Sequence, residues 1–189
     1  MSLLEIGVAA FGAVYVVLAA RNNAWCWPAG IISAALCIVF DVQLKYYLDA
    51  ILQAYYVAAG FYGWYLWTRS TNAAASAGLS ITAYPLKKQL PFIALGIVLT
   101  PAFGYVFSGL GNAYPYLDAL TAVFSFIATY LTAKRILQSW LWWILIDILL
   151  IGQYIVKDAN VLAFFYFFLT IMAFYGYFQW RKKFVVHDL

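Results

Sequence analysis

One carboxylate of this sequence lies in the middle of a long apolar run. Asp147 follows SWLWWILI at 139–146, twelve residues after Arg135 and ten before Lys157. The other six acidic residues lie at the ends of apolar runs, in loops or in the tail: Glu5, Asp41, Asp49, Asp118, Asp158 and Asp188. A charge at the centre of a membrane-spanning helix costs roughly 2.5–3.5 kcal/mol on insertion scales. We therefore expect Asp147 to face a cavity, or else to be a structural carboxylate that is hydrogen-bonded between helices or protonated.

Two tryptophans share a helical face with this carboxylate. At about 100° per residue, Trp140, Trp143 and Asp147 fall within about 60° of one another, whereas Trp142 points the opposite way and is expected to face lipid. Two indoles beside a carboxylate suit a flat, aromatic cation, because the rings supply stacking and cation–π attraction. Alternatively, Trp140 and Trp143 belong to an interfacial aromatic belt, since basic residues precede this run.

An earlier apolar run carries a matching polar face. Gln53, Tyr56, Gly60, Gly63 and Trp67 recur at helical spacing. The amide of Gln53 could bind ligand heteroatoms, and Tyr56 could line the same site. The glycines are expected to permit close helix packing. On this face we therefore expect Gln53 and Tyr56 to bind substrate and the glycines to pack against a neighbouring helix.

The elements that must position these side chains are membrane helices. The chain has 189 residues, of which 67% are hydrophobic and 10% charged, far from the roughly 25% charged residues of soluble domains. A spanning helix needs about 20 mainly apolar residues. Seven such runs are present, at about Leu3–Ala20, Trp25–Phe40, Tyr46–Trp67, Leu90–Leu110, Tyr116–Ala133, Trp140–Val156 and Val161–Trp180. The sequence predicts an all-α integral membrane protein.

A weak internal repeat relates the two ends of the chain. At an offset of 113 positions, Trp27 falls on Trp140, and FYGWYLW at 61–67 falls on FYGYFQW at 174–180. We predict two parallel three-helix repeats, 1–69 and 114–183, joined by a linker helix at 86–110 within a single domain, 1–189. In transporters of this plan the substrate site lies between the repeats near the midplane of the membrane.

The repeat and the helix periodicity add further candidates. Tyr166 is the repeat partner of Gln53, and Tyr154 lies on the same helical face as Asp147, where it could cap the site or belong to an outer belt. Trp27 and Gly176 are expected to be structural. Pro28 lies in the first turn of its span, where its missing N–H is tolerated, so it is a helix start and a candidate hinge.

Basic residues predict the orientation. Nine lie on one side of the seven predicted spans and only Lys45 and Lys157 on the other. The positive-inside rule then predicts a cytoplasmic C-terminus and an N-terminus outside.

Several functional classes lack support in the sequence. The two cysteines, eleven residues apart in one predicted helix, lie too far apart for a disulfide. His187 is the single histidine, so no metal site is expected. No cofactor motif, catalytic triad or nucleotide-binding loop is present, and the basic residues lie in short loops between spans. We expect neither an enzyme nor a nucleic-acid-binding protein, and the short cytoplasmic segments argue against a sensor.

The segments RNNAWCWPAGI (21–31), LQAYYVAAGFYGWYLW (52–67), SWLWWILID (139–147) and FYGYFQWRKK (174–183) resemble the Pnu-type vitamin transporters, the PnuC family. The resemblance implies a seven-helix, SWEET-like 3+1+3 fold in the bacterial cytoplasmic membrane. It implies facilitated diffusion of a vitamin that a cytoplasmic vitamin kinase traps by phosphorylation. It also implies a homo-oligomer such as a trimer.

The resemblance also bears on the substrate. The family pattern in the sixth span is W-x-x-W, three residues and a polar position. The nicotinamide riboside members typically carry Asn at that position, and the thiamine branch (PnuT) typically carries Asp. Here the pattern is Trp140, Trp143 and Asp147, so the resemblance favours thiamine. Nicotinamide riboside uptake, and proton-coupled symport with Asp147 as proton carrier, remain the alternatives.

Overall fold

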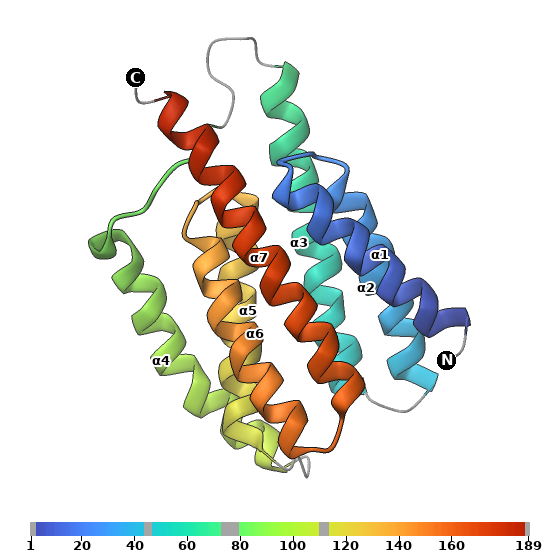
Figure 1. Cartoon of the computed structure of the whole chain (residues 1–189). Coiled ribbons are helices and arrows are strands. Elements are labelled where there is room, and N and C mark those ends of the chain that lie inside the picture. The colour runs from blue at the N-terminus through green and yellow to red at the C-terminus, as the bar shows by residue number, and fades with distance from the viewer. Residues whose placement is uncertain (1–2, 44–46, 73–79, 110–113, 188–189) are drawn as a thin grey trace.

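Seven α-helices account for most of the described chain (Figure 1). The computed structural model describes residues 3–43, 47–72, 80–109 and 114–187. The helices are α1 (Leu3–Ala20), α2 (Cys26–Gln43), α3 (Tyr47–Asn72), α4 (Leu86–Gly109), α5 (Pro115–Ala133), α6 (Ser139–Val156) and α7 (Asn160–His187). Each corresponds to one predicted span, so the all-α prediction is confirmed. The predicted span ends at Tyr46 and Leu110, and Lys45, lie outside the described residues.

Local signals explain where several helices begin and end. Pro28 is the third residue of α2, in its first turn as predicted, and Pro115 begins α5, where proline is favoured. Helices α3 and α7 continue beyond the predicted ends at Trp67 and Trp180, because polar and charged residues extend a helix past the membrane without disfavouring helical backbone.

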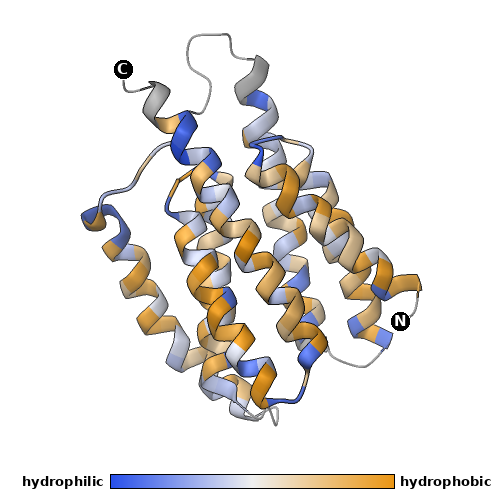
Figure 2. Cartoon of the chain, in the orientation of Figure 1, coloured by the Kyte–Doolittle hydropathy of each residue, from blue (hydrophilic) through white to orange (hydrophobic). Residues whose placement is uncertain are grey.

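Six of the seven helices among the described residues are long and apolar enough to cross a membrane. The exception is α3, whose many Tyr and Trp side chains and Gln53 lower its hydropathy (Figure 2). Figure 2 shows apolar residues along the middle of the bundle and hydrophilic residues near its ends. The chain is therefore a multi-pass membrane protein.

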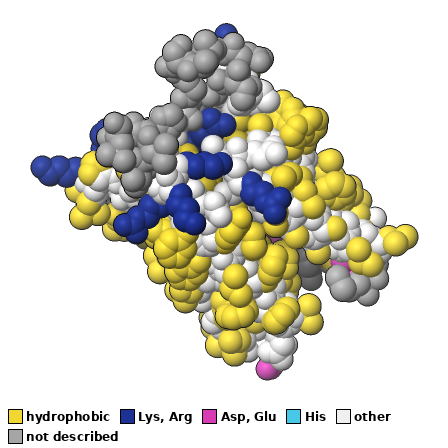
Figure 3. All heavy atoms as spheres, turned by 45° about the horizontal axis from the view of Figure 1, so that its top comes forward, with side chains coloured by type: hydrophobic (Ala, Val, Ile, Leu, Met, Phe, Trp, Pro, Cys, Tyr) yellow, Lys and Arg dark blue, Asp and Glu magenta, His cyan; other side chains and the backbone are white. Residues whose placement is uncertain are grey.

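The helices run in alternating directions (Figure 1), so that α1, α3, α5 and α7 all end at the same end of the bundle. We call this the basic end, because lysines and arginines gather there (Figure 3): Arg21, Arg69, Lys87, Lys88, Lys134, Arg135, Arg181, Lys182 and Lys183. The opposite end holds the start of α1 and the α6–α7 connection. The two chain termini lie at opposite ends.

Helices α1–α3 form one group and α5–α7 another, and α4 packs on the outer side of α5 (Figure 1). The two groups meet where α1 contacts α7 and where α3 contacts α5. The space between these two contacts is where the cavities described below are found.

Matched residues of the weak sequence repeat make matched contacts. The Trp27 ring lies directly against Gly63, so closely that a Cβ there would clash, and the Trp140 ring lies in the same way 2.7 Å from the position of a Cβ on Gly176. A glycine on the third helix of each group thus lets a tryptophan of the second helix pack against bare backbone.

The connections α1–α2 and α5–α6 also match. Asn22 has a positive φ of 58° and Arg135 one of 55°. The Asn22 N–H donates to the Ala19 carbonyl at 2.9 Å, and the Arg135 N–H donates to the Thr132 carbonyl, also at 2.9 Å. Both residue pairs are related by the same offset of 113 positions. The backbone is therefore alike at these two connections.

Candidate functional site

A cavity of about 280 Å³ lies between the two helix groups. Helices α1, α6 and α7 contribute most of its walls, and α2, α3 and α5 add a few side chains. The lining residues are Val8, Gly12, Tyr15, Val16, Ala19, Ser33, Tyr56, Ser125, Thr132, Trp140, Trp143, Asp147, Leu150, Phe165, Tyr166, Leu169 and Ala173. Most are apolar or aromatic, with a few hydroxyls and one carboxylate, which is the usual character of a small-molecule site. We call it the central cavity.

Asp147 lines this cavity and is only 3% exposed. Within the described part of the chain, no hydrogen bond or ion pair to its carboxylate is found. Polar groups that are buried away from water are normally paired, and an ionised carboxylate in an apolar site is strongly disfavoured without a partner. Asp147 is thus chemically suited to bind a cation or a hydrogen-bond donor that enters the cavity.

The two tryptophans of the predicted face line the central cavity beside Asp147. The Trp143 indole Nε1–H donates to the Thr132 hydroxyl at 3.2 Å, which fixes the ring against α5. Trp140 is buried and packs edge-on against Trp180, with 5.4 Å between ring centroids. The Trp140 indole N–H has no hydrogen-bond partner among the described residues. The cavity therefore presents two oriented indoles near one carboxylate.

Trp142 points away from this face, as the helical angles predict, but the expectation that it faces lipid is wrong. It is half-buried, and its ring stacks on Phe124 of α5 with centroids 5.3 Å apart and planes 15° apart. Helix α5 lies beside that face of α6, which a single helix considered alone cannot reveal.

A second cavity of about 180 Å³ adjoins the central one. The two share Gly12, Tyr15, Ser33, Tyr56 and Trp143. The remaining lining residues of this second cavity are Trp27, Gly30, Ala34, Gln53, Gly60 and Thr129.

The predicted residues of α3 lie in different parts of this site. Gln53 lines the second cavity but not the central one, whereas Tyr56 lines both. Gly60 packs against Ile31 of α2 and Gly63 against Trp27, which is the close helix packing expected of these glycines.

Tyr154 and Tyr166 form a stacked pair towards the opposite end of the bundle. Their ring centroids are 5.4 Å apart and their planes differ by 10°. Tyr166 lines the central cavity, whereas Tyr154 is not among the lining residues. Tyr154 therefore lies behind Tyr166 as a second aromatic layer rather than directly over Asp147.

Four buried tryptophans close the bundle towards its basic end. Trp27 packs edge-on against Trp67 with centroids 5.5 Å apart, Trp67 lies 6.0 Å from Trp180, and Trp180 packs on Trp140. Ile81, which precedes α4, is buried in the same cluster.

Hydrogen bonds tie this tryptophan cluster to both helix groups. The Trp67 indole N–H donates to the Ala133 carbonyl of α5, and the Trp180 indole N–H donates to the Ala19 carbonyl of α1, both at 3.0 Å. Each group thus supplies a tryptophan to the end of the other group's first helix. Separating the two groups at the basic end would break both bonds.

Arg135 adds a fixed charge at this end. Its guanidinium lies over the Trp67 ring, 4.5 Å from the centroid. Burial lowers the pKa of Arg135, but the ordinary value of an arginine is above 12, so the guanidinium stays charged.

Several lining residues were not singled out from the sequence. Tyr15 and Ser33 line both cavities from α1 and α2. Helix α5 carries hydroxyl residues at intervals of three or four positions: Thr121, Ser125, Thr129 and Thr132. The last three of these line the two cavities. This periodicity could have identified the α5 face. Apart from Glu5 in its first turn, α1 is made of apolar residues, so no polar face marks Tyr15 as lining a site.

A family profile described as nicotinamide mononucleotide transporter matches residues 2–182, nearly the whole chain. The chain belongs to the nicotinamide mononucleotide transporter family. The predicted Pnu-type resemblance is thereby confirmed, and the protein is a membrane transporter of this family rather than an enzyme.

Relatives of this family are similar along most of the chain. The nicotinamide riboside transporter PnuC of Escherichia coli (strain K12) is 26% identical over 176 residues, covering 80% of this chain and 73% of that protein. The PnuC of Neisseria mucosa is 26% identical over 96% of this chain and 73% of its own length. The riboflavin/roseoflavin transporter RibM of Streptomyces davaonensis is 29% identical over 72% of this chain and 65% of its own length.

A solved structure agrees with the fold. The crystal structure of the vitamin B3 transporter PnuC aligns with a TM-score of 0.79 and 26% identity, covering 98% of this chain and 83% of that one. The seven helices therefore adopt the fold of a known transporter of this family.

Proposed function

We propose that this protein mediates facilitated uptake of a flat, cationic aromatic vitamin, thiamine, through the central cavity. The observation that carries the proposal is the buried Asp147 carboxylate, which lines the central cavity together with Trp140 and Tyr166 and has no partner in the described chain. A cation about 5 Å away would gain roughly 3 kcal/mol at an effective dielectric constant of about 20.

The aromatic walls support the same ligand class. Trp140 and Trp143 line the cavity, and a cation over an indole face gains about 0.5–2 kcal/mol. Tyr56, Tyr166 and Gln53 supply hydrogen-bonding groups around the two connected cavities. Tyr154 supports Tyr166 from behind.

Two vitamins are compatible with this chemistry. Asp147 at the polar position of the family's sixth-span pattern supports thiamine, whose aminopyrimidine can donate a hydrogen bond to a carboxylate while the thiazolium charge is offset. Nicotinamide riboside is the second candidate, because two relatives bear that substrate in their names. Riboflavin, which RibM transports by name, is uncharged and makes less use of Asp147.

Binding measurements on purified protein test the substrate. Titration calorimetry in detergent with thiamine, nicotinamide riboside and riboflavin should give the tightest binding for thiamine and the weakest for riboflavin. Tight binding of nicotinamide riboside without measurable thiamine binding would replace thiamine by the second candidate. Tight binding of riboflavin alone would contradict the cationic class altogether.

The transport mode is tested in proteoliposomes. A uniporter lets thiamine equilibrate across the membrane without concentrating it, and a cytoplasmic vitamin kinase then traps the vitamin by phosphorylation. A proton symporter that uses Asp147 would instead accumulate thiamine when a pH gradient is imposed. Equal steady-state levels with and without the gradient support facilitated diffusion.

We further propose the arrangement of the chain in the membrane. Residues 1–69 and 114–183 form parallel repeats around the cavity, and 86–110 links them. The repeated tryptophan–glycine contacts support this division. The basic end faces the cytoplasm of a bacterium, which follows from the positive-inside rule, so the N-terminus is outside. The homo-oligomer, a trimer, implied by the family resemblance completes this proposal.

A further inference from the structure

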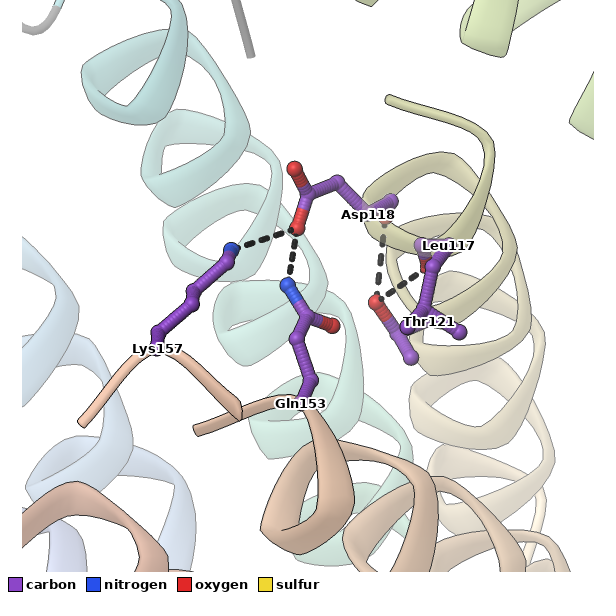
Figure 4. Close-up of polar contacts among 5 residues, drawn as sticks. All are labelled: Leu117, Asp118, Thr121, Gln153 and Lys157. Atoms are coloured by element: carbon purple, nitrogen blue, oxygen red, sulfur yellow. Dashed lines mark hydrogen bonds and ion pairs between the residues drawn. The ribbon is translucent and has the colours of Figure 1, made fainter. Parts of the chain in front are cut away.

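At the opposite end of the bundle, one ammonium group lies among a carboxylate and two aromatic rings. The Lys157 Nζ is 3.3 Å from the Asp118 Oδ1 (Figure 4). The same Nζ lies 5.7 Å from the ring centroid of Tyr114 and 5.9 Å from that of Tyr154. Asp118 and Tyr114 come from the start of α5, and Lys157 follows α6. We call Asp118, Tyr114 and Tyr154 the outer box.

The outer box has the chemistry of the central cavity. Both combine a carboxylate with aromatic side chains, which is a composition that binds organic cations. No lysine or arginine is among the described residues that line the central cavity, whereas the outer box already holds the Lys157 ammonium. A site that binds a tethered ammonium can bind a free organic cation when the tether moves aside.

Solvent and ligands can reach the outer box. The side chains of Lys157 and Asp118 are 29% and 20% exposed, so the ion pair is partly solvated. Partly exposed ion pairs are held by only about 0–1 kcal/mol. Lys157 can therefore be displaced by a ligand of matching charge.

The Asp118 carboxylate is held in place by a buried neighbour. The Gln153 Nε2–H donates to the Asp118 Oδ1, as Figure 4 shows. Gln153 is 5% exposed, and its Oε1 has no hydrogen-bond partner among the described residues. The box therefore offers a carboxylate that a buried amide holds in position.

One residue of the outer box contacts the wall of the central cavity. Tyr154 belongs to the box, and its ring stacks on Tyr166, which lines the central cavity. This stacked pair is thus the contact through which the box adjoins the central cavity.

We propose that the outer box is a first binding site for the transported aromatic cation, in which the Lys157 ammonium is a tethered competitor that the arriving vitamin displaces. This proposal rests on the proposed function, because it takes a cationic vitamin as the substrate. The alternative role of Lys157 is structural, since it caps the C-terminal end of α6, where a cation is favourable.

The test measures initial rates of thiamine uptake into proteoliposomes that expose the opposite end to the medium. Lys157→Met keeps an unbranched stem but removes the competing charge, so the KM for thiamine should fall about threefold. Asp118→Asn should raise the KM about threefold while the maximal rate changes little. Lys157→Arg keeps the positive charge, so its KM for thiamine should stay near that of the wild type.

Asp158→Asn is the matched control. Asp158 lies beside Lys157 but outside the box, is exposed, and has a positive φ of 54°, which asparagine tolerates. Like Asp118→Asn, the Asp158→Asn variant removes one negative charge from the opposite end of the bundle, but it should leave the KM for thiamine unchanged. An equal rise in KM for Asp158→Asn and Asp118→Asn would overturn the proposal, because it would reflect general surface charge.

The remaining outcomes separate this proposal from the proposed function. If Asp147→Asn weakens uptake while Lys157→Met keeps the wild-type KM, the outer site alone is refuted. If the wild type takes up neither thiamine nor nicotinamide riboside, the proposed function fails and the outer site fails with it. If Asp118→Asn does not fold, the Lys157 variants still decide the question.

Discussion

Helices α2 and α6 are the middle helices of the two groups, yet only α6 places a carboxylate among the described residues that line the two cavities. Trp27 and Trp140 are alike: each packs against a glycine of the next helix. Three residues further on, α2 has Gly30 where α6 has Trp143, and after another turn α2 has Ala34 where α6 has Asp147. The two helices share their packing residues and differ where they face the cavities.

The side chains that α2 and α6 direct at the cavities differ in size and charge. The small residues of α2 leave the space that forms the second cavity, which both Gly30 and Ala34 line. The large and charged residues of α6 project into the central cavity. The two helices thus share a tryptophan–glycine contact and differ in the side chains that line the cavities.

The largest expected loss of thiamine affinity comes from removing the negative charge that α6 carries and α2 lacks at the matched position. Asp147→Asn keeps the shape of the side chain but removes the charge that offsets a bound cation, a loss of a few kcal/mol. The affinity for thiamine should fall by well over tenfold in titration calorimetry. Asp158→Asn, far from the cavities on the α6–α7 connection, should leave the affinity unchanged. An unchanged affinity for Asp147→Asn would mean that this carboxylate is structural.

The shared part of the comparison is tested by the paired glycines. Gly63→Ala and Gly176→Ala each place a methyl group against a tryptophan ring, and such overpacking costs about 1–3 kcal/mol. Both variants should unfold at a lower temperature in detergent. Gly176→Ala should also weaken thiamine binding more than Gly63→Ala does, because it displaces Trp140, which lines the central cavity.

Gly152→Ala is the control for these glycines. Gly152 is exposed on α6, and a Cβ there meets no atom within 4 Å. In a helix this substitution stabilises by about 0.5–1 kcal/mol. If Gly63→Ala and Gly176→Ala raised the unfolding temperature as Gly152→Ala does, the tryptophan–glycine contacts would not be tight enough to stabilise the helix packing within each group.

The smallest expected effect concerns the support of Trp143. Thr132→Val removes the hydroxyl that accepts the indole N–H at 3.2 Å, and one such hydrogen bond contributes about 1 kcal/mol. Thiamine affinity should fall about fivefold. Thr129→Val is the matched change one turn away, where the hydroxyl donates to the Ser125 carbonyl of its own helix, and it should have little effect. Equal losses in the two variants would show that Trp143 needs no support from α5.

The sequence predicted the helices well because their causes are local. Hydrophobic runs of bilayer length predict spans, and all seven predicted spans are helices here. The face shared by Trp140, Trp143 and Asp147 follows from helical periodicity alone, and all three side chains line one cavity. The repeat found by aligning the chain on itself reappears as matched contacts of Trp27 and Trp140.

The tertiary structure decided what lies opposite each face. Trp142 was expected to face lipid but stacks on Phe124, because α5 lies there. Gln53 lines the second cavity, and Tyr154 lies behind Tyr166. Helical periodicity determines which residues share a face of one helix, but which face meets which neighbour depends on packing among helices distant in sequence. The charge at Asp147 is therefore a property of the sequence, whereas the cavity that surrounds it exists only in the packed bundle.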